Sequence, residues 1–91
     1  MYKIAFTAKF KKQRKLLIAR RYNISLLDEA VKMLAKGETL PEKYCDHALQ
    51  GKWKGYRDCH ILPEWILIYK IDKGILTLLL TATGSHADLF G

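Results

Sequence analysis

The chain has 91 residues, 49% of them hydrophobic, which is enough for one domain with a small core over residues 1–91 and excludes a disordered chain. Its formal net charge of +7 suits a polyanion such as nucleic acid, although a positively charged surface can also serve solubility alone. No stretch approaches the roughly 20 apolar residues of a membrane span, and the N-terminus lacks the apolar run of a secretory signal, so we expect a cytoplasmic protein with no membrane partner.

A short strand is expected over residues 2–6, followed by a helix over residues 8–21. Thr7 can cap this helix, and Phe10 and Leu17, seven residues apart, would face the core. Residues 1–36 hold ten Lys or Arg against two acidic residues, whereas residues 37–91 hold six against seven. The basic positions of the helix are Lys9, Lys11, Lys12, Arg14, Lys15, Arg20 and Arg21. This helix is therefore the expected basic surface.

A second amphipathic helix is indicated by apolar residues from Leu27 to Leu34. Ser25, followed three residues later by Asp28, resembles a capping box, and Gly37 would end the helix. The two helices are expected to form an antiparallel pair.

Strand-like composition dominates from Gly51 onward, with strands expected over residues 54–62, 65–71 and 75–83. The turns between them, at residues 63–64 and 72–74, are short and predict a three-stranded antiparallel meander. Two helices packed on one face of this sheet, with the first strand at an edge, give an α+β domain.

Alternation along the strand at residues 54–62 places Lys54, Tyr56, Asp58 and His60 on one face and Arg57 on the other. A carboxylate beside an imidazole orients the ring and raises its pKa, which suits acid–base catalysis near neutral pH. A solvated ion pair on an exposed strand face explains Asp58 and His60 equally well, and Arg57 can form a structural salt bridge rather than bind phosphate.

The remaining candidates lie in loops and beside strands. His86 follows Thr83-Gly84-Ser85 and is expected on a loop or short turn, as a reactive group or an ordinary surface histidine. Cys45, His47, Cys59 and His60 include the ligand types of zinc, but without a Cys-x-x-Cys pair their spacing argues against a metal site. Cys59 suits the core better. Trp53 and Trp65 can stack on bases or fill a core.

Two segments resemble the YafQ type of the RelE toxin superfamily. Residues 46–60 match the pattern DHxLxGxWxGxRDxH, and residues 83–90 match the closing TGSHxxLF. The resemblance implies a RelE-like fold and the toxin of a type II toxin–antitoxin pair. Such a toxin is an endoribonuclease that cuts mRNA codons in the ribosomal A site, and its partners are the ribosome with its rRNA, the mRNA and a cognate antitoxin.

The resemblance also implies no metal and no cofactor, because the ribose 2′-OH of the RNA itself attacks the adjacent phosphate. It carries the active-site positions to His47, Asp58, His60, Glu64, His86 and Phe90. We expect His86 to be the acid and His60 or His47 the base, with Asp58 holding His60 and Phe90 stacking on a nucleotide or pinning the tail. Contacts to RNA or the ribosome are expected from Lys9, Lys11, Lys12, Arg14, Lys15, Lys52, Lys54 and Arg57.

Two positions depart from the pattern of the family. Glu64 stands where relatives usually have Asp, and Ala82 stands where relatives commonly have an arginine that steadies the phosphate. Two alternatives therefore stay open: a ParE-like inhibitor of DNA gyrase, which has the same architecture without the histidines, and a relative that binds its partner without catalysis.

Overall fold

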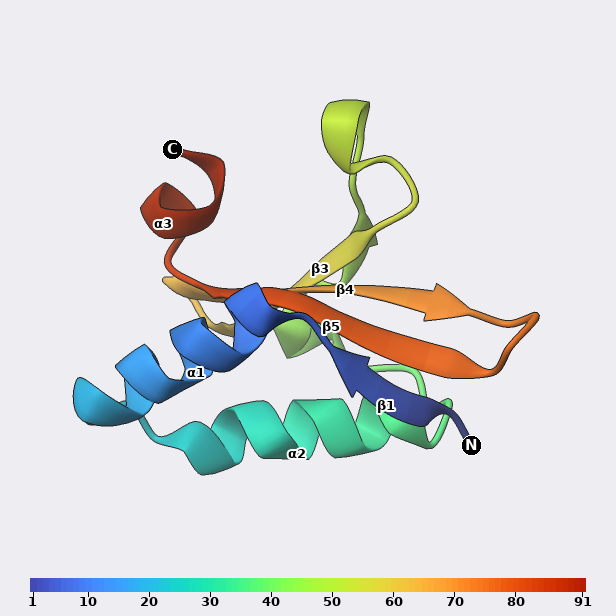
Figure 1. Cartoon of the computed structure of the whole chain (residues 1–91), viewed down its shortest axis with the longest axis horizontal. Coiled ribbons are helices and arrows are strands. Elements are labelled where there is room, and N and C mark those ends of the chain that lie inside the picture. Colours follow the sequence, from blue (N-terminus) through green and yellow to red (C-terminus); the bar gives the residue numbers. More distant parts are fainter.

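A five-stranded sheet forms the centre of the structure, a computed structural model that describes residues 1–91 (Figure 1). Its strands follow the order β1-β5-β4-β3-β2, and β3, β4 and β5 form the expected antiparallel meander. The short first strand pairs in parallel with β5, at the expected edge position. The strands are β1 (Lys3–Phe6), β2 (His47–Ala48), β3 (Arg57–Leu62), β4 (Trp65–Asp72) and β5 (Thr77–Gly84), and the helices are α1 (Ala8–Ala19), α2 (Ile24–Ala35) and α3 (His86–Phe90).

Helices α1 and α2 pack against one face of the sheet and enclose the main core (Figure 1). Phe10 and Leu17 of α1 are both buried there, as their spacing predicts, and they meet Leu27 and Leu34 of α2. The hydroxyl of Thr7 accepts the backbone N–H of Phe10 at 3.0 Å, so the predicted cap of α1 is confirmed. No helix combines the length and the apolar composition that a membrane crossing requires.

The predicted cap of the second helix is wrong. Helix α2 begins at Ile24 after Asn23, so Ser25 lies inside the first turn, where its hydroxyl donates to the Asn23 side chain at 2.6 Å. The first helix also ends at Ala19, two residues before the expected end, because Arg21 has a left-handed backbone (φ 63°) that no helix continues.

The strand expected over residues 54–62 begins only at Arg57. Residues Gly51–Trp53 form a short 3₁₀ turn that Lys54 terminates, and Gly55 has φ 94°, so the chain enters the sheet three residues later than expected. Lys54 is therefore outside the alternation of β3, whereas Tyr56, Asp58 and His60 keep the shared face that was predicted for them.

A smaller apolar cluster covers the opposite face of the sheet. It consists of Ile66, Ile68, Ala82 and Leu89, with Leu49, Trp53, Tyr56 and Phe90 packed around it. A register shift between β4 and β5 pairs Ile68 with Ala82 and Tyr69 with Leu80, so Thr81 has no partner in the ladder. This bulge turns Ala82 away from the face of Leu80 and toward the smaller cluster. Helix α3 then closes over that face.

Candidate active site

Asp58 lies on the sheet face opposite α1 and α2, where His47 contacts its carboxylate and the charges of His60 and His86 also act on it. His47 comes from β2, His60 from β3 and His86 from the start of α3. Asp58 is only 3% exposed, and burial raises the pKa of its carboxyl, while the charges of His47, His60 and His86 act to lower it. Strands β2 and β3 and helix α3 thus bring titratable side chains near one buried acid, which makes this face the candidate site.

His47 is held in one orientation by two oxygen atoms. Its Nδ1 lies 2.8 Å from the carbonyl oxygen of Cys45 and 3.2 Å from Oδ1 of Asp58. Only the contact with the carbonyl has hydrogen-bond geometry, and Oδ1 of Asp58 is buried without a hydrogen-bond partner. A carbonyl oxygen can only accept, so Nδ1 carries the proton and Nε2 presents a lone pair. The carboxylate lies where it would stabilise a proton taken up by this ring.

The prediction that Asp58 holds His60 is wrong. Nδ1 of His60 lies 3.2 Å from the carbonyl oxygen of Pro63, in the turn between β3 and β4. Asp58 instead stands directly opposite His47, because the two-residue strand β2 pairs His47 with Asp58 and Ala48 with Arg57. The sequence analysis missed this strand, because two residues are too few to give a periodic signal.

His86 is the first residue of the five-residue helix α3 rather than part of a loop. Ser85 caps the helix: its hydroxyl accepts the N–H of Asp88 at 3.1 Å, and the Asp88 carboxylate accepts the N–H of Ser85 at 3.2 Å. The ring centroids of His86 and Phe90 are 4.9 Å apart. The cap and the aromatic contact together fix the orientation of the short helix.

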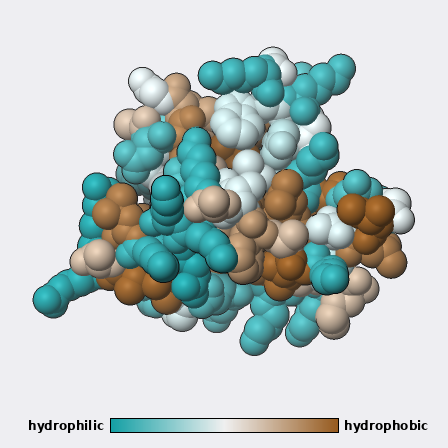
Figure 2. Space-filling model, viewed as in Figure 1, coloured by the Kyte–Doolittle hydropathy of each residue, from teal (hydrophilic) through white to brown (hydrophobic).

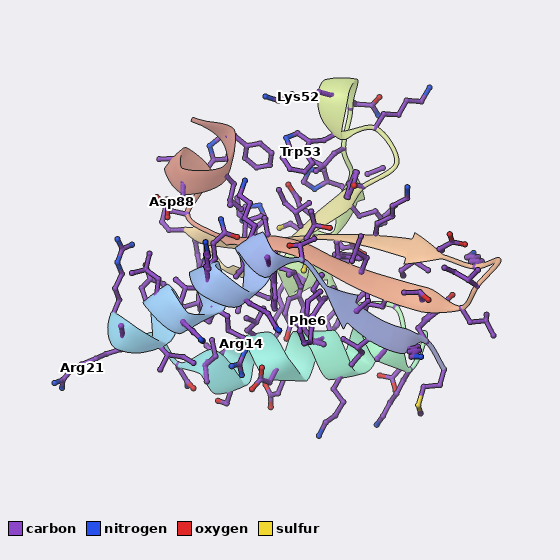
Figure 3. The ribbon with its side chains drawn as sticks, viewed as in Figure 1. Phe6, Arg14, Arg21, Lys52, Trp53 and Asp88 are labelled. Atoms are coloured by element: carbon purple, nitrogen blue, oxygen red, sulfur yellow. The ribbon has the colours of Figure 1, made fainter.

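An aromatic cluster ties α3 to the turn before β3. The ring centroids of Trp53 and Phe90 lie 6.3 Å apart, and those of Trp53 and Tyr56 lie 5.5 Å apart. Figure 3 shows Trp53 between the turn at residues 51–53 and α3. Phe90 therefore does pin the tail to the body of the protein, while Trp65 is 1% exposed and belongs to the main core.

Two predicted site residues form no salt bridge with the histidines. Glu64 is exposed in the turn between β3 and β4, directly after Pro63. The Nε of Arg57 lies 3.3 Å from Oδ1 of Asp46, on the sheet face opposite Asp58, so this arginine forms a structural salt bridge. Arg57 is not available to bind phosphate beside the histidines.

The matches with known proteins cover nearly the whole chain. Residues 2–91 match the family model described as bacterial toxin of type II toxin-antitoxin system, YafQ. This chain belongs to the YafQ family. The mRNA interferase toxin YafQ of Escherichia coli K12 is 42% identical over 89 residues, which are 97% of this chain and 95% of the relative.

Solved structures agree with this assignment. The YafQ chain in the crystal structure of the E. coli DinJ-YafQ complex is 40% identical, matches with a TM-score of 0.92, and both chains are fully covered. A metal-bound toxin from Helicobacter pylori is also 40% identical, with a TM-score of 0.93 and coverage of 99% of this chain and 100% of that one. The RelE-like α+β fold expected from the sequence is confirmed.

In this member of the YafQ family the cysteines and histidines form no metal-binding group. No group of three or more His, Cys, Asp or Glu side chains is arranged to hold a metal ion. Cys45 is exposed and Cys59 is buried, and burial strongly raises the pKa of the Cys59 thiol, so Cys59 stays a protonated core residue.

Ala82, at the position where the YafQ pattern commonly has arginine, lies in the floor of the site. It is 1% exposed and shares a row across the sheet with Ile68 and Asp58. A cation that sequence reasoning missed lies in the next row: Lys70, whose Nζ is 5.4 Å from the ring centroid of Tyr56. The alternation of β4, with Ile66 and Ile68 on the same face, was the signal for it.

The predicted basic surface of this YafQ-family chain is largely exposed. Lys9, Lys11, Lys12 and Lys15 project from α1, and Lys52 and Lys54 are exposed at the turn before β3. Figure 2 shows hydrophilic side chains spread over the region of α1, with hydrophobic atoms visible between them. Arg14 differs, since its Nη2 pairs with the Asp28 carboxylate at 3.1 Å. Its charge is therefore partly offset within the protein.

A groove runs beside the basic helix, between β1, α1 and α2. Its lining includes the apolar residues Ile4, Phe6 and Phe10 and the basic residues Lys11 and Lys15, while its one acidic residue, Asp28, is paired with Arg14. Ile4 and Phe6 are 44% and 49% exposed, unusual values for apolar residues of a sheet. The Phe6 ring stacks on Phe10 and lies under Lys11 Nζ, 5.1 Å away; Figure 3 shows Phe6 beside α1. An apolar lining with basic residues suits an acidic, amphipathic segment.

Proposed function

We propose that this protein is a ribosome-dependent mRNA endoribonuclease, the toxin of its pair, that cuts codons in the A site and thereby stops translation. The observation that carries the proposal is the contact of His47 with the buried Asp58, on whose carboxylate the charges of His60 and His86 also act. Support comes from the relative named mRNA interferase toxin, which shares 42% of its residues with this chain.

The proposed chemistry needs only side chains and the RNA itself. Nε2 of His47 takes the proton of the ribose 2′-OH, whose oxygen attacks the adjacent phosphorus. The bond from phosphorus to the 5′-oxygen breaks, leaving a 2′,3′-cyclic phosphate, and His86 donates a proton to the departing oxygen. Asp58 stabilises the positive charge that His47 acquires, since its Oδ1 lies 3.2 Å from Nδ1. The reaction needs no metal ion or cofactor.

Charge on the attacked phosphate is offset by His60 and by lysines, in place of the arginine expected at position 82. Lys70 and Lys54 are the nearest candidates, because Lys70 stands over Tyr56 on the histidine face and Lys54 ends the adjacent turn. Phe90 and Trp53 then provide aromatic faces beside His86 for a nucleotide of the codon.

The proposal is tested by adding the purified protein to mRNA in a translation mixture, with and without ribosomes, and mapping new 5′ ends by primer extension. We expect in-frame cuts that require ribosomes and that disappear with His86→Ala. Cuts that appear equally on naked RNA would contradict the ribosome-dependent part. The absence of cuts in every lane would favour a gyrase-directed or purely binding relative, the latter being the alternative that Ala82 supports.

The basic α1 surface is expected to dock on ribosomal RNA. Replacing its four exposed lysines by Gln should reduce the salt dependence of cleavage, because each lost phosphate contact lowers the slope of log activity against log salt by about 0.9. The lysines are Lys9, Lys11, Lys12 and Lys15. Cleavage would be measured from roughly 50 to 200 mM salt. The double change Lys32→Gln, Lys36→Gln, within and directly after α2, serves as control. A wild-type activity that does not depend on salt would exclude this docking mode.

The groove beside α1 is the proposed contact for an acidic segment of the antitoxin. Phe6→Asp should weaken antitoxin binding at least about tenfold, since it places a charge in the apolar lining and repels acidic groups. Cleavage without antitoxin should persist, because Phe6 is 49% exposed and distant from the histidine face. Titration calorimetry measures the affinity, with Ile75→Asp at the 71% exposed hairpin position as control. Unchanged affinity would place the antitoxin elsewhere.

A further inference from the structure

We infer that Asp46 and Tyr69 are positioning residues that hold His47 in the form able to accept a proton. Oδ1 of Asp46 accepts a hydrogen bond of 2.7 Å from the Tyr69 hydroxyl and one of 3.3 Å from Nε of Arg57. This Asp46 cluster stands immediately before His47 in the chain. The inference rests on the proposed nuclease function only for the role of His47, since the contacts themselves are independent of it.

The cluster holds the strand from the face opposite the histidine. Tyr69 and Arg57 are partners in the β3–β4 ladder, and Tyr69 belongs to the core under the helices, whereas His47 stands beside Asp58 on the other face. Asp46 directly precedes strand β2. Its side chain is bound to Tyr69 on the face of the helices, whereas the side chain of His47 lies beside Asp58 on the opposite face.

The backbone around His47 needs such an anchor. Strand β2 pairs with β3 at only two residue pairs, and it lies at the edge of the sheet. The residue before the cluster, Cys45, has a left-handed backbone (φ 49°, ψ 40°), which is a strained conformation for a non-glycine residue. Two ladder pairs at an edge are a weak restraint against relaxation of that strain.

Cys45, the strained residue, also supplies the carbonyl oxygen that orients the His47 ring. Cys45 contributes the carbonyl that accepts from Nδ1 of His47 at 2.8 Å, so the orientation of residue 45 decides which ring nitrogen carries the proton. Asp46 follows directly, and its side chain is fixed by two donors. Loss of those donors would release the Cys45 carbonyl and leave both tautomers of His47 accessible.

The charges of the Asp46 cluster keep its hydrogen bonds in place at physiological pH. Tyr69 is 1% exposed, and burial followed by its hydrogen bond to Asp46 strongly raises the pKa of the hydroxyl, so the proton it donates stays in place. Arg57 compensates the carboxylate charge. The salt bridge that removes Arg57 from phosphate binding thus has a structural use beside the active site.

The test compares Asp46→Asn and Tyr69→Phe with Tyr44→Phe, a change at another buried tyrosine, one with no hydrogen bond to Asp46. Tyr69→Phe keeps the packing volume and removes only the hydroxyl. We expect kcat to fall about 10- to 100-fold in both cluster variants with KM little changed, by analogy with residues that orient a functional imidazole. Tyr44→Phe should cleave as the wild type does.

A second measurement determines the tautomer of His47 directly, in the absence of substrate. In ¹⁵N spectra of the free protein, His47 should show the tautomer protonated at Nδ1, and the cluster variants should shift its signals toward a mixture, while those of His60 stay unchanged. An unchanged His47 tautomer in both variants would overturn the inference, whatever their activity. If the tautomer shifts but wild-type protein cuts no RNA, the proposed nuclease fails while the positioning role stands.

Discussion

Replacing His47 or His86 by Gln lowers the rate of mRNA cleavage by at least about 100-fold, the usual cost of losing a general acid or base. Both side chains are exposed, and glutamine keeps a polar group of similar size, so the melting temperature should stay within a few degrees of the wild type. Rates are measured in single-turnover reactions on programmed ribosomes. A loss below tenfold in both variants would contradict the assignment.

The pH dependence separates the two roles. A base must be unprotonated and an acid protonated, so wild-type cleavage should follow a bell-shaped pH profile. The residual activity of His47→Gln should lack the fall on the acidic side, because no base remains to be protonated. His86→Gln should lack the fall on the alkaline side. The reverse pattern would exchange the roles of the two histidines.

Asp58→Asn is expected to make the protein more stable and far less active. The carboxylate is 3% exposed with one oxygen unpaired, so its charge costs free energy in the fold, and removing it should stabilise by about 1 kcal/mol at neutral pH. Cleavage should fall at least about 100-fold, because His47 loses the group that stabilises its protonated form.

The stability difference depends on pH with a defined sign. Burial raises the pKa of Asp58 above its ordinary value of 3.8, so the folded protein binds this proton more readily than the unfolded chain. The stability that the protonated Asp58 contributes is fully present below pH 3.8 and is lost as the pH rises through the pKa of Asp58 in the folded protein. Wild type and Asp58→Asn should therefore have similar melting temperatures near pH 3.8, and the variant should gain above it.

Calorimetric melting curves from low to neutral pH measure that divergence. Asp28→Asn is the control, since its carboxylate is exposed in a surface salt bridge with Arg14 and should contribute little. A variant less stable than wild type at neutral pH would show that the buried carboxylate is compensated by its neighbours.

The sheet was predictable because its signals are local. Alternation with period two and short turns define β3 to β5, and the same alternation places Asp58 and His60 on one face and Arg57 on the other. The buried stripe of α1 and its Thr7 cap follow from local spacing in the same way. The assignment of the histidines as a site came from the resemblance to the YafQ family, and their convergence required the fold.

Contacts set by pairing between distant segments were not predictable. Strand β2 has two residues and α3 has five, too few for a periodic pattern, yet they supply His47 and His86. The partner of Asp58 depends on the register of β2 with β3, and the burial of Ala82 depends on the bulge at Thr81. Whether Arg57 is free to bind phosphate was open for the same reason, since only the packed sheet shows that it is paired with Asp46.

The end groups of the cut RNA distinguish attack by the 2′-OH from hydrolysis assisted by a metal ion. The protein is incubated with programmed ribosomes in the presence of EDTA at a concentration that ribosomes tolerate, and the fragments are examined for end groups. Attack by the 2′-OH with histidine acid–base catalysis predicts a 2′,3′-cyclic phosphate on the upstream fragment and a 5′-hydroxyl on the downstream fragment. A 3′-hydroxyl with a 5′-phosphate, formed only when an added transition metal is present, would contradict catalysis by the histidines without a metal.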